Sequence, residues 1–259
     1  GDGRHIDGIG LGFTASSPLP ALAGGMPLSE CHPGQPHAYV KLWKHAAAQP
    51  YAARINAQGG AFLDNYGGKL SGEWLLAKAW QMADEAPALW AETARFIEAG
   101  DWLVWQLTGA EVRSLGLAAY KAQYSDAAGY PEVGVPGLHS RLTRPLPIGS
   151  AAGGLADDWR RRTGIGGPAK VGVAAIDSHL TLPGVGATAG GTLAAALGTW
   201  AVYLCLADTF RPLPKGIEGV AKDGSVRGLG CYEAGQAGGG GPLGGGAELG
   251  PRGADTARE

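Results

Sequence analysis

The pattern of the sequence changes at Lys170-Val171-Gly172-Val173-Ala174-Ala175-Ile176. Small and β-branched residues with a single charge at the start are typical of a buried strand. The segments before this strand carry mainly helical patterns and those after it carry strand patterns, which predicts an α/β protein. Asp177 follows directly, so we expect its carboxylate at the carboxyl end of a strand, where ligands of α/β sheets gather.

Upstream of this point the sequence predicts one strand and then mainly helices. Residues 5–14 alternate apolar and small residues before two prolines, as a strand that enters a loop does. Helical spacing or a glycine stop predicts helices over residues 38–48, 73–82, 87–97, 101–109 and 156–163. The last two end at Gly109 and Gly164, and glycine is a common helix stop.

Downstream the sequence predicts strands and then a tail. Residues 191–198 and 200–206 have the pattern of a hairpin, and residues 220–226 predict another, whose Asp223-Gly224 pair suits a tight turn. Residues 237–259 hold nine glycines in 23 residues and only two large apolar side chains. Such a segment cannot build a hydrophobic core.

Composition narrows the classes of ligand and partner. The 259 residues carry a formal net charge of −2 and a pI near 6.3, which gives no basic surface for nucleic acid. Cys31, Cys205 and Cys231 form no CxxC pair, which argues against a disulfide framework or zinc cluster and favours the cytoplasm. We recognise no secretion signal or membrane-spanning run. We therefore expect a small-molecule ligand, and the sequence leaves open whether the chain forms a homo-oligomer.

A few residues could carry chemistry, and each has a structural alternative. Asp177 could accept a proton or cap a following helix. The turn Gly198-Thr199 could bind phosphate through its backbone N–H groups and hydroxyl, or only join two strands. Lys121 and Glu233 lie in segments with few other charges, so each could face a polar ligand or solvent. Phosphoryl transfer to a hydroxyl needs these types of group.

Longer blocks around these residues are similar to a known family. They are Pro36-His37-Ala38-Tyr39-Val40-Lys41-Leu42-Trp43-Lys44-His45, Glu73-Trp74-Leu75-Leu76, Phe96 to Gly109, Ala119-Tyr120-Lys121-Ala122, Gly149 to Leu155, Ala175-Ile176-Asp177-Ser178-His179, Leu197-Gly198-Thr199 and Tyr232-Glu233-Ala234-Gly235-Gln236. With these blocks in one order over residues 9–236, the chain resembles the FGGY family of carbohydrate kinases and, within it, the ribulokinases. The first block is the most diagnostic of them.

The resemblance implies an α/β, actin-like (ribonuclease H-like) FGGY kinase fold, with sugar and ATP in the cleft between two domains. Residues 1–187 would form the sugar-binding N-terminal domain without its first strands. Residues 188–236 would begin the ATP-binding C-terminal domain, and residues 237–259 would be a glycine-rich tail. Because FGGY kinases are considerably longer, the chain looks like a fragment, and we expect it to be inactive alone.

The resemblance also implies a reaction and its residues. Asp177 matches the catalytic base, and Ala15, Lys121 and Glu233 match positions that line the sugar site with it. Gly198-Thr199 is similar to the turn that contacts the ATP phosphates, and no metal-ligating side chain is implied. The implied reaction transfers the γ-phosphate of ATP, with Mg²⁺, to the 5-hydroxyl of a ketopentose, foremost L-ribulose in L-arabinose catabolism.

Some positions depart from the family pattern, and alternatives stay open. Gly12 and Trp200 are unusual in the sugar loop and the phosphate turn. After Gln236 the pattern gives way to the glycine-rich tail, which we interpret as a reading-frame slip in a GC-rich gene or as a natural flexible tail. The alternatives are an inactive sugar-binding fragment and an FGGY kinase for another pentulose or polyol.

Overall fold

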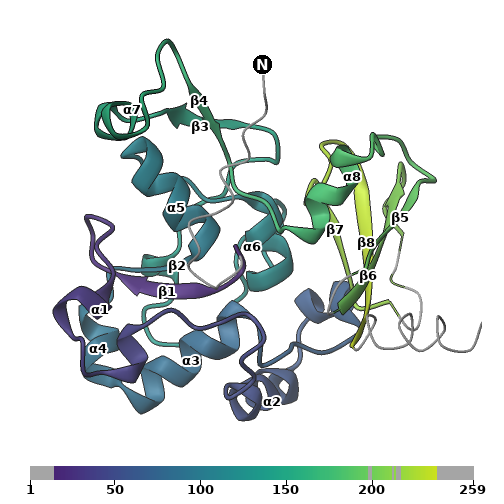
Figure 1. Ribbon diagram of the computed structural model, residues 1–259. Coiled ribbons are helices and arrows are strands. Elements are labelled where there is room, and N and C mark those ends of the chain that lie inside the picture. The colour runs from purple at the N-terminus through teal and green to yellow at the C-terminus, as the bar shows by residue number, and fades with distance from the viewer. Residues whose placement is uncertain (1–14, 198–199, 212, 214–216, 238–259) are drawn as a thin grey trace, which may run out of the picture.

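The computed structural model describes residues 15–197, 200–211, 213 and 217–237, so the strand predicted over residues 5–14 lies outside the described residues. A mainly helical part and a four-stranded sheet lie side by side (Figure 1). Helix α6 (Leu115–Ala122) packs between them, against α3 (Leu75–Glu85) and strand β7 (Gly219–Lys222). The helices precede the main sheet along the chain, as the sequence predicts.

The rest of the helical structure consists of short α-helices and short 3-10 helices. The other α-helices are α1 (Leu28–Cys31), α2 (Gln49–Gln58), α4 (Pro87–Glu92), α5 (Ala99–Thr108), α7 (Asp157–Thr163) and α8 (Thr181–Gly184). The 3-10 turns are η1 (Pro36–Ala38), η2 (Ala61–Tyr66), η3 (His139–Arg141) and η4 (Ser178–Leu180). In the described part of the chain, none of these helices has the length and apolar character needed to cross a bilayer.

Three predicted helices are confirmed with small shifts of their ends. Helix α3 covers most of residues 73–82 and continues to Glu85. Helices α5 and α7 end at Gly109 and Gly164, which have φ values of 76° and 69°. Glycine reaches this left-handed conformation without a Cβ clash, which explains both stops.

Residues 38–48 do not form the predicted helix. The backbone N–H of Lys41 donates to Pro18 O at 2.7 Å, and that of Trp43 donates to Ser17 Oγ at 3.0 Å. These bonds use backbone donors that a helix would pair internally. The prediction fails because long-range contacts with the segment around β1 (Pro18–Ala21) replace the local hydrogen bonds.

The helix predicted over residues 87–97 is interrupted. Helix α4 ends before Thr93, which has extended dihedrals of −65° and 108°. Strand β2 (Arg95–Glu98) then pairs antiparallel with β1, with Ile97 opposite Leu19. Phe96 and Ile97 are fully buried. Pairing and burial therefore override the helical spacing of the second half of this segment.

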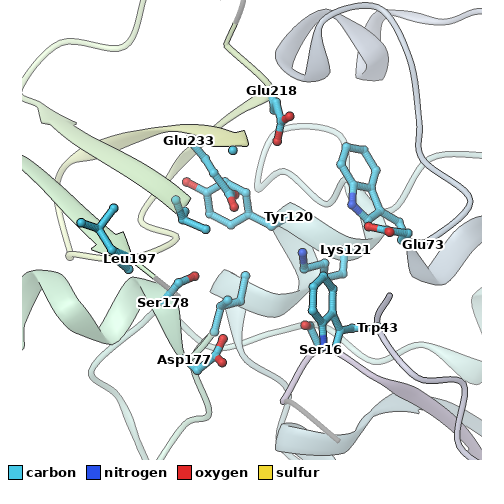
Figure 2. A pocket seen from close by; sticks show the side chains of 15 residues that line it. Ser16, Trp43, Glu73, Tyr120, Lys121, Asp177, Ser178, Leu197, Glu218 and Glu233 are labelled. Atoms are coloured by element: carbon cyan, nitrogen blue, oxygen red, sulfur yellow. The ribbon is translucent and has the colours of Figure 1, made fainter. Parts of the chain in front are cut away.

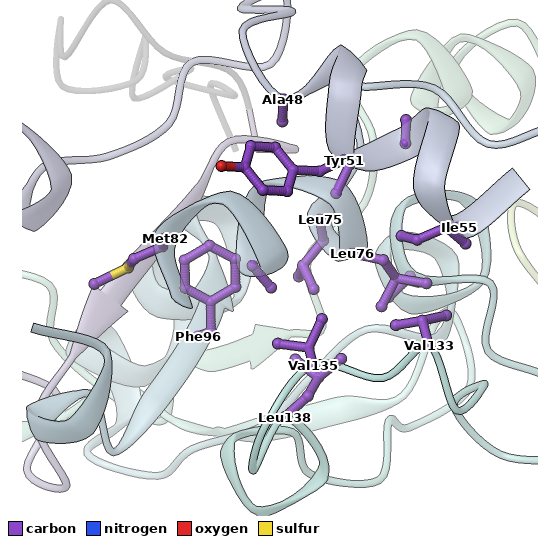
Figure 3. Close-up of a cluster of buried hydrophobic side chains, with 14 of the residues drawn as sticks. Ala48, Tyr51, Ile55, Leu75, Leu76, Met82, Phe96, Val133, Val135 and Leu138 are labelled. Atoms are coloured by element: carbon purple, nitrogen blue, oxygen red, sulfur yellow. The ribbon is translucent and has the colours of Figure 1, made fainter. Parts of the chain in front are cut away.

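The main hydrophobic core lies beneath α2, α3 and α4. Leu75, Ala79 and Met82 on α3 are buried and follow helical spacing, so they project from one face. Figure 3 shows this cluster, in which the α3 side chains meet residues of α2, β2 and the loop after α6: Tyr51, Ile55, Phe96, Val133, Val135 and Leu138. This core supports the elements that carry the helical side of the site described below.

The strand predicted over residues 170–176 is shorter and less buried than expected. Strand β4 (Lys170–Gly172) pairs antiparallel with β3 (Ala151–Gly154) in a two-stranded sheet, and Lys170 is exposed. The alanines and glycines of β3 are too small to cover the neighbouring strand. After Gly172 the chain leaves this sheet, and Ile176 is buried against α6.

The main sheet has four antiparallel strands in the order β5-β6-β8-β7. Strands β5 (Leu193–Leu197) and β6 (Trp200–Ala207) form the predicted hairpin, with Leu193 opposite Cys205. Strand β8 (Gly230–Ala237) lies between β6 and β7. Its buried Cys231 packs with residues of α8 and β6, which closes a second, smaller core.

The hairpin predicted over residues 220–226 is correct only for its first strand. Strand β7 ends at Lys222, and Asp223, at a φ of 57°, opens a loop that reaches Leu229. The backbone N–H of Asp223 donates to Leu229 O at 2.9 Å, which closes this loop. The loop is longer than the tight turn that the Asp-Gly pair suggested. Its Gly224 lies against Tyr120 of α6, and its Val226 and Leu229 pack against the core around Cys231.

Candidate functional site

A cavity of about 500 Å³ lies where the helical part meets the main sheet. Segments that are far apart in the sequence line it together (Figure 2). Its polar and aromatic lining residues include Ser16, Trp43, Glu73, Trp74, Tyr120, Lys121, Asp177, Ser178, Glu218 and Glu233. A cavity of this volume suits a small molecule.

Three of the predicted sugar-site residues line this cavity together. Lys121 comes from the last turn of α6, Asp177 from the start of η4 and Glu233 from β8. In Figure 2 the Lys121 ammonium lies near the centre of the view, with Asp177 and Glu233 to one side of it and Glu73 to the other. The fold thus gathers a cation and two carboxylates from three separate elements.

Of the other predicted site residues, Ala15 is described and does not line the cavity. Ala15 packs its methyl group in a cluster with Leu117 and Ile176, while the neighbouring Ser16 lines the cavity. Gly198-Thr199 lies outside the described residues.

Asp177 is not placed directly after a strand, contrary to the sequence-based prediction, because β4 already ends at Gly172. It stands at the N-terminal end of η4 with helical dihedrals of −54° and −49°. Its side chain makes no capping hydrogen bond to η4 and is exposed toward the cavity. The alternative that Asp177 serves as a helix cap is therefore wrong.

Lys121 is presented by a helix whose other residues are buried. Ser114 begins α6, and its Oγ accepts a hydrogen bond from the Gly116 N–H at 3.2 Å. Within α6 only Lys121 is half-buried, since it reaches out of the core into the cavity. The C-terminal end of a helix carries partial negative charge, which favours a cation in the last turn.

Glu233 is a largely buried carboxylate on β8, opposite Leu204 of β6 and Gly219 of β7. Its Oε2 lies 3.4 Å from Nε2 of the buried His179. Burial alone would raise the pKa of Glu233, but the contact with His179 and the charges of His179 and Lys121 outweigh it and lower the pKa to about 2. Glu233 is therefore ionised at neutral pH and can only accept hydrogen bonds.

A second carboxylate, Glu218, lies beside Glu233 on the sheet side of the cavity. The backbone N–H of Glu218 donates to Glu233 O at 2.9 Å. Burial and then the negative charge of Glu233 raise the pKa of Glu218. The two neighbouring carboxylates thus have pKa values shifted in opposite directions, because only Glu233 has a basic residue in direct contact.

The sequence did not predict several lining residues. Trp43, Glu73 and Trp74 lie within the family-like blocks, but no chemical pattern assigns them to a site. Glu218 lies in the segment before β7, and nothing in its local sequence sets it apart. Only the folded chain brings these residues opposite Lys121 and Glu233.

The charges and rings of the cavity suit a polyhydroxylated ligand. Its described lining holds four carboxylates, on Glu73, Asp177, Glu218 and Glu233, and one ammonium, on Lys121. Carboxylates accept hydrogen bonds from hydroxyl groups, and tryptophan rings offer apolar faces to carbon-bound hydrogens. Excess negative charge disfavours a triphosphate here. Among the residues that the structure describes, no cluster of three or more His, Cys, Asp or Glu side chains could hold a metal ion.

Comparison with known proteins identifies relatives along most of the chain. No family model matches it. The chain is 39% identical to the ribulokinase of Bacillus licheniformis over 251 residues, which cover 91% of this chain and 45% of that protein. It is 38% identical to the ribulokinase of Mycolicibacterium smegmatis, over 92% of this chain and 45% of that protein. The chain thus spans about half the length of the curated relatives it matches.

Solved structures show the same fold at low sequence identity. The xylulose kinase from Rhodospirillum rubrum matches with a TM-score of 0.71 and 17% identity, over 92% of this chain and 48% of that chain. The Plasmodium falciparum glycerol kinase, solved with ADP, matches with a TM-score of 0.71 and 12% identity, over 91% of this chain and 47% of that chain. The chain is therefore a homologue of the ribulokinases and has the α/β fold of the FGGY carbohydrate kinases over about half of their length.

Proposed function

We propose that this chain carries the sugar site and the general base of an ATP-dependent kinase that phosphorylates the 5-hydroxyl of L-ribulose. One observation supports the proposal above all. Lys121, Asp177 and Glu233, three residues in family-like blocks of a chain 39% identical to ribulokinases, line one cavity of about 500 Å³. A buried core or an ordinary surface would not gather these three charges around an empty volume of sugar size.

Asp177 is the proposed general base. A sugar hydroxyl is too weakly acidic to ionise at neutral pH, so a carboxylate that accepts its proton assists attack on phosphorus. The exposed Asp177 side chain faces the cavity and is not used as a helix cap, which leaves it available for a ligand hydroxyl. ATP would supply the phosphoryl group, and Asp177 would hold the proton that the hydroxyl loses.

Lys121 and Glu233 are the proposed positioning groups for the sugar. A ketopentose offers a carbonyl oxygen and several hydroxyls, so it needs both donors and acceptors in its site. The Lys121 ammonium can only donate, and the ionised Glu233 can only accept. Bonds from both residues would orient the sugar so that one hydroxyl faces Asp177.

We further propose that the sugar and nucleotide domains meet at this cavity, with residues 1–187 in the first and 188–236 in the second. Lys121 and Asp177 would then bind the sugar from one domain and Glu233 from the other. Leu197 lines the cavity and directly precedes Gly198-Thr199, the proposed contact for the ATP phosphates. The described lining itself is assigned to the sugar and not to the nucleotide or to Mg²⁺.

Two measurements on the purified 259-residue chain test the proposal. Titration calorimetry would compare L-ribulose with D-xylulose, ribitol and glycerol, and we expect L-ribulose to bind most tightly. Transfer of labelled phosphate from ATP with Mg²⁺ to L-ribulose would test the reaction. Absence of L-ribulose binding, or tighter binding of another polyol, would overturn the proposed substrate.

A second candidate function is sugar binding without phosphoryl transfer. It is favoured by one observation, since the chain spans only 45% of the length of the ribulokinase of Bacillus licheniformis. The same two measurements separate the candidates, because this one predicts L-ribulose binding without labelled product. Labelled L-ribulose 5-phosphate from the purified chain would exclude it.

A further inference from the structure

Buried His179 connects the segment of Asp177 with the strand of Glu233. We propose that His179 is a positioning residue of the sugar site, which holds the Glu233 carboxylate in place at the cavity. The role in sugar binding rests on the proposed function, whereas the hold on Glu233 can be tested without any sugar. Nothing in the similarity to kinases assigns this role, and it follows from the contacts of the imidazole.

Both ring nitrogens of His179 face a polar group on the sheet side. Its Nδ1 lies 2.5 Å from Ser225 Oγ, in the loop between β7 and β8, and its Nε2 lies 3.4 Å from Glu233 Oε2. When the Ser225 hydroxyl donates to Nδ1, the ring proton is on Nε2 and faces Glu233. In the charged ring both nitrogens carry protons. The other neutral tautomer, with its proton on Nδ1, would set the Nε2 lone pair against the Glu233 carboxylate and is disfavoured, so an Nε2–H faces Glu233.

Packing prevents the imidazole from turning toward another partner. His179 is only 2% exposed, and its ring packs edge-to-face against Tyr120, with centroids 4.5 Å apart. Tyr120 is itself held by a hydrogen bond from its hydroxyl to Cys231 O at 2.6 Å. Because Cys231 lies on the same strand as Glu233, the ring and the carboxylate are held by one set of contacts.

The Nε2–H group has no well-formed hydrogen bond among the described residues. A distance of 3.4 Å exceeds the 2.7–2.9 Å that is usual between a charged donor and a carboxylate. A buried donor without a partner is unfavourable, so the ring favours an ionised Glu233 nearby over a neutral or displaced one. Contacts of this kind often shorten when a ligand completes the site.

The other charged and titratable groups around Glu233 do not replace His179. Lys121 also lowers the pKa of Glu233, whereas the burial of the Glu233 carboxylate opposes its ionisation. Glu218, Tyr66, Tyr120 and Cys231 also interact electrostatically with Glu233, and none of them supplies a cation. Without the Nε2–H group, only Lys121 would remain to offset the cost of burying the ionised Glu233 carboxylate.

A matched pair of variants tests the proposal. Asn places its amide near the position of Nδ1, so His179→Asn keeps a partner for Ser225 and loses the group that faces Glu233. Gln reaches the position of Nε2, so His179→Gln keeps that donor. We expect the Glu233 pKa, measured by carbon NMR with labelled glutamate and assigned with Glu233→Gln, to rise in His179→Asn and to stay close to the parent value in His179→Gln.

Sugar affinity gives the second measurement. The Kd for L-ribulose should rise about tenfold in His179→Asn and by less than about threefold in His179→Gln, as loss of one hydrogen bond to a charged group predicts. In a chain that already carries Glu233→Gln, the His179→Asn change should have little further effect on the Kd for L-ribulose, because the two residues act as a unit. His139→Asn, in exposed η3, serves as the control for loss of a histidine.

The outcomes separate the two proposals. An unchanged Glu233 pKa in a folded His179→Asn chain, or independent effects of the two substitutions, would overturn the role of His179. If the parent chain binds no L-ribulose, the proposed function fails, and the NMR titration still decides whether His179 holds Glu233. If His179→Asn does not fold, Ser225→Ala takes its place, because it removes the hydroxyl partner of Nδ1. This variant should also raise the Glu233 pKa. An unchanged Glu233 pKa in Ser225→Ala would contradict the proposal.

Discussion

The Tyr120 hydroxyl donates a hydrogen bond to the backbone carbonyl oxygen of Cys231 at 2.6 Å. Both residues are buried, and this bond joins α6 to β8 across the boundary between the helical part and the main sheet. Lys121 follows Tyr120 directly, and Glu233 lies on the same strand as Cys231. The bond therefore sets the separation of the two groups that we assign to the sugar.

Removal of the Tyr120 hydroxyl should destabilise the chain and loosen the site. Tyr120→Phe leaves the buried Cys231 carbonyl without this donor, so we expect a loss of about 1–2 kcal/mol in the free energy of unfolding. Urea titration would measure it, and L-ribulose affinity should fall as well. Tyr124→Phe is the matched control, because the Tyr124 hydroxyl makes only a 3.3 Å bond to nearby Asp126. Equal stability of the two variants would contradict the prediction.

Gly224 should not tolerate a methyl group. A Cβ at this position would lie 2.7 Å from the Tyr120 ring and 3.1 Å from Ala221 Cβ, so α6 and β7 would have to separate. Gly224→Ala should lower the free energy of unfolding by about 1–3 kcal/mol, as overpacking in a core does. Thermal or urea unfolding would measure the change. Gly166→Ala is the control, since its Cβ would meet nothing within 4 Å, and a comparable loss there would argue against the packing explanation.

Asp177→Asn should separate sugar binding from phosphoryl transfer. An amide has the size of the carboxylate but cannot accept the proton of the hydroxyl, so in the intact kinase we expect a loss of about 10²-fold or more in labelled phosphate transfer. The Kd for L-ribulose, measured by calorimetry, should change by less than about threefold. Asp64→Asn, at an exposed position of η2, should leave both quantities unchanged. Equal transfer rates of the intact kinase with and without the Asp177→Asn change would end the assignment.

Glu98 should make stability depend on pH. Both of its carboxylate oxygens are buried without a hydrogen-bond partner among the described residues. Burial raises the pKa of Glu98 to about 8, although the nearby Lys78 opposes the shift. Because the folded state then binds the proton more tightly than the unfolded chain, this contribution to stability is complete below about pH 4.5 and is lost as pH rises toward 8.

Replacement of Glu98 tests directly whether stability falls as pH rises. From pH 5 to pH 8, Glu98→Gln should gain about 1–3 kcal/mol in the free energy of unfolding relative to the parent, since the amide never ionises. Urea titrations at several pH values would show the difference. Glu30→Gln, at the exposed end of α1, should follow the parent at every pH. A difference between Glu98→Gln and the parent that is independent of pH would contradict the prediction.

Local patterns predicted the elements whose causes are local. The ends of α5 and α7 at Gly109 and Gly164 follow from the ease with which glycine adopts a left-handed conformation. The β5–β6 hairpin follows from two adjacent apolar runs. By contrast, residues 38–48 and 95–98 carry helical spacing and yet make long-range contacts with the segment around β1, which no local pattern encodes.

The features of the candidate site likewise fall into those that the sequence indicates and those that only the fold creates. The sequence by itself determined the similarity to ribulokinases and marked Lys121, Asp177 and Glu233, because each lies in a block that resembles them. Only the tertiary structure decided that these residues share a cavity with Glu218 and that His179 contacts Glu233. The physical reason is that burial, charge–charge contacts and enclosed volume arise between elements far apart in the chain, so they exist only after α6, η4 and β8 have packed together.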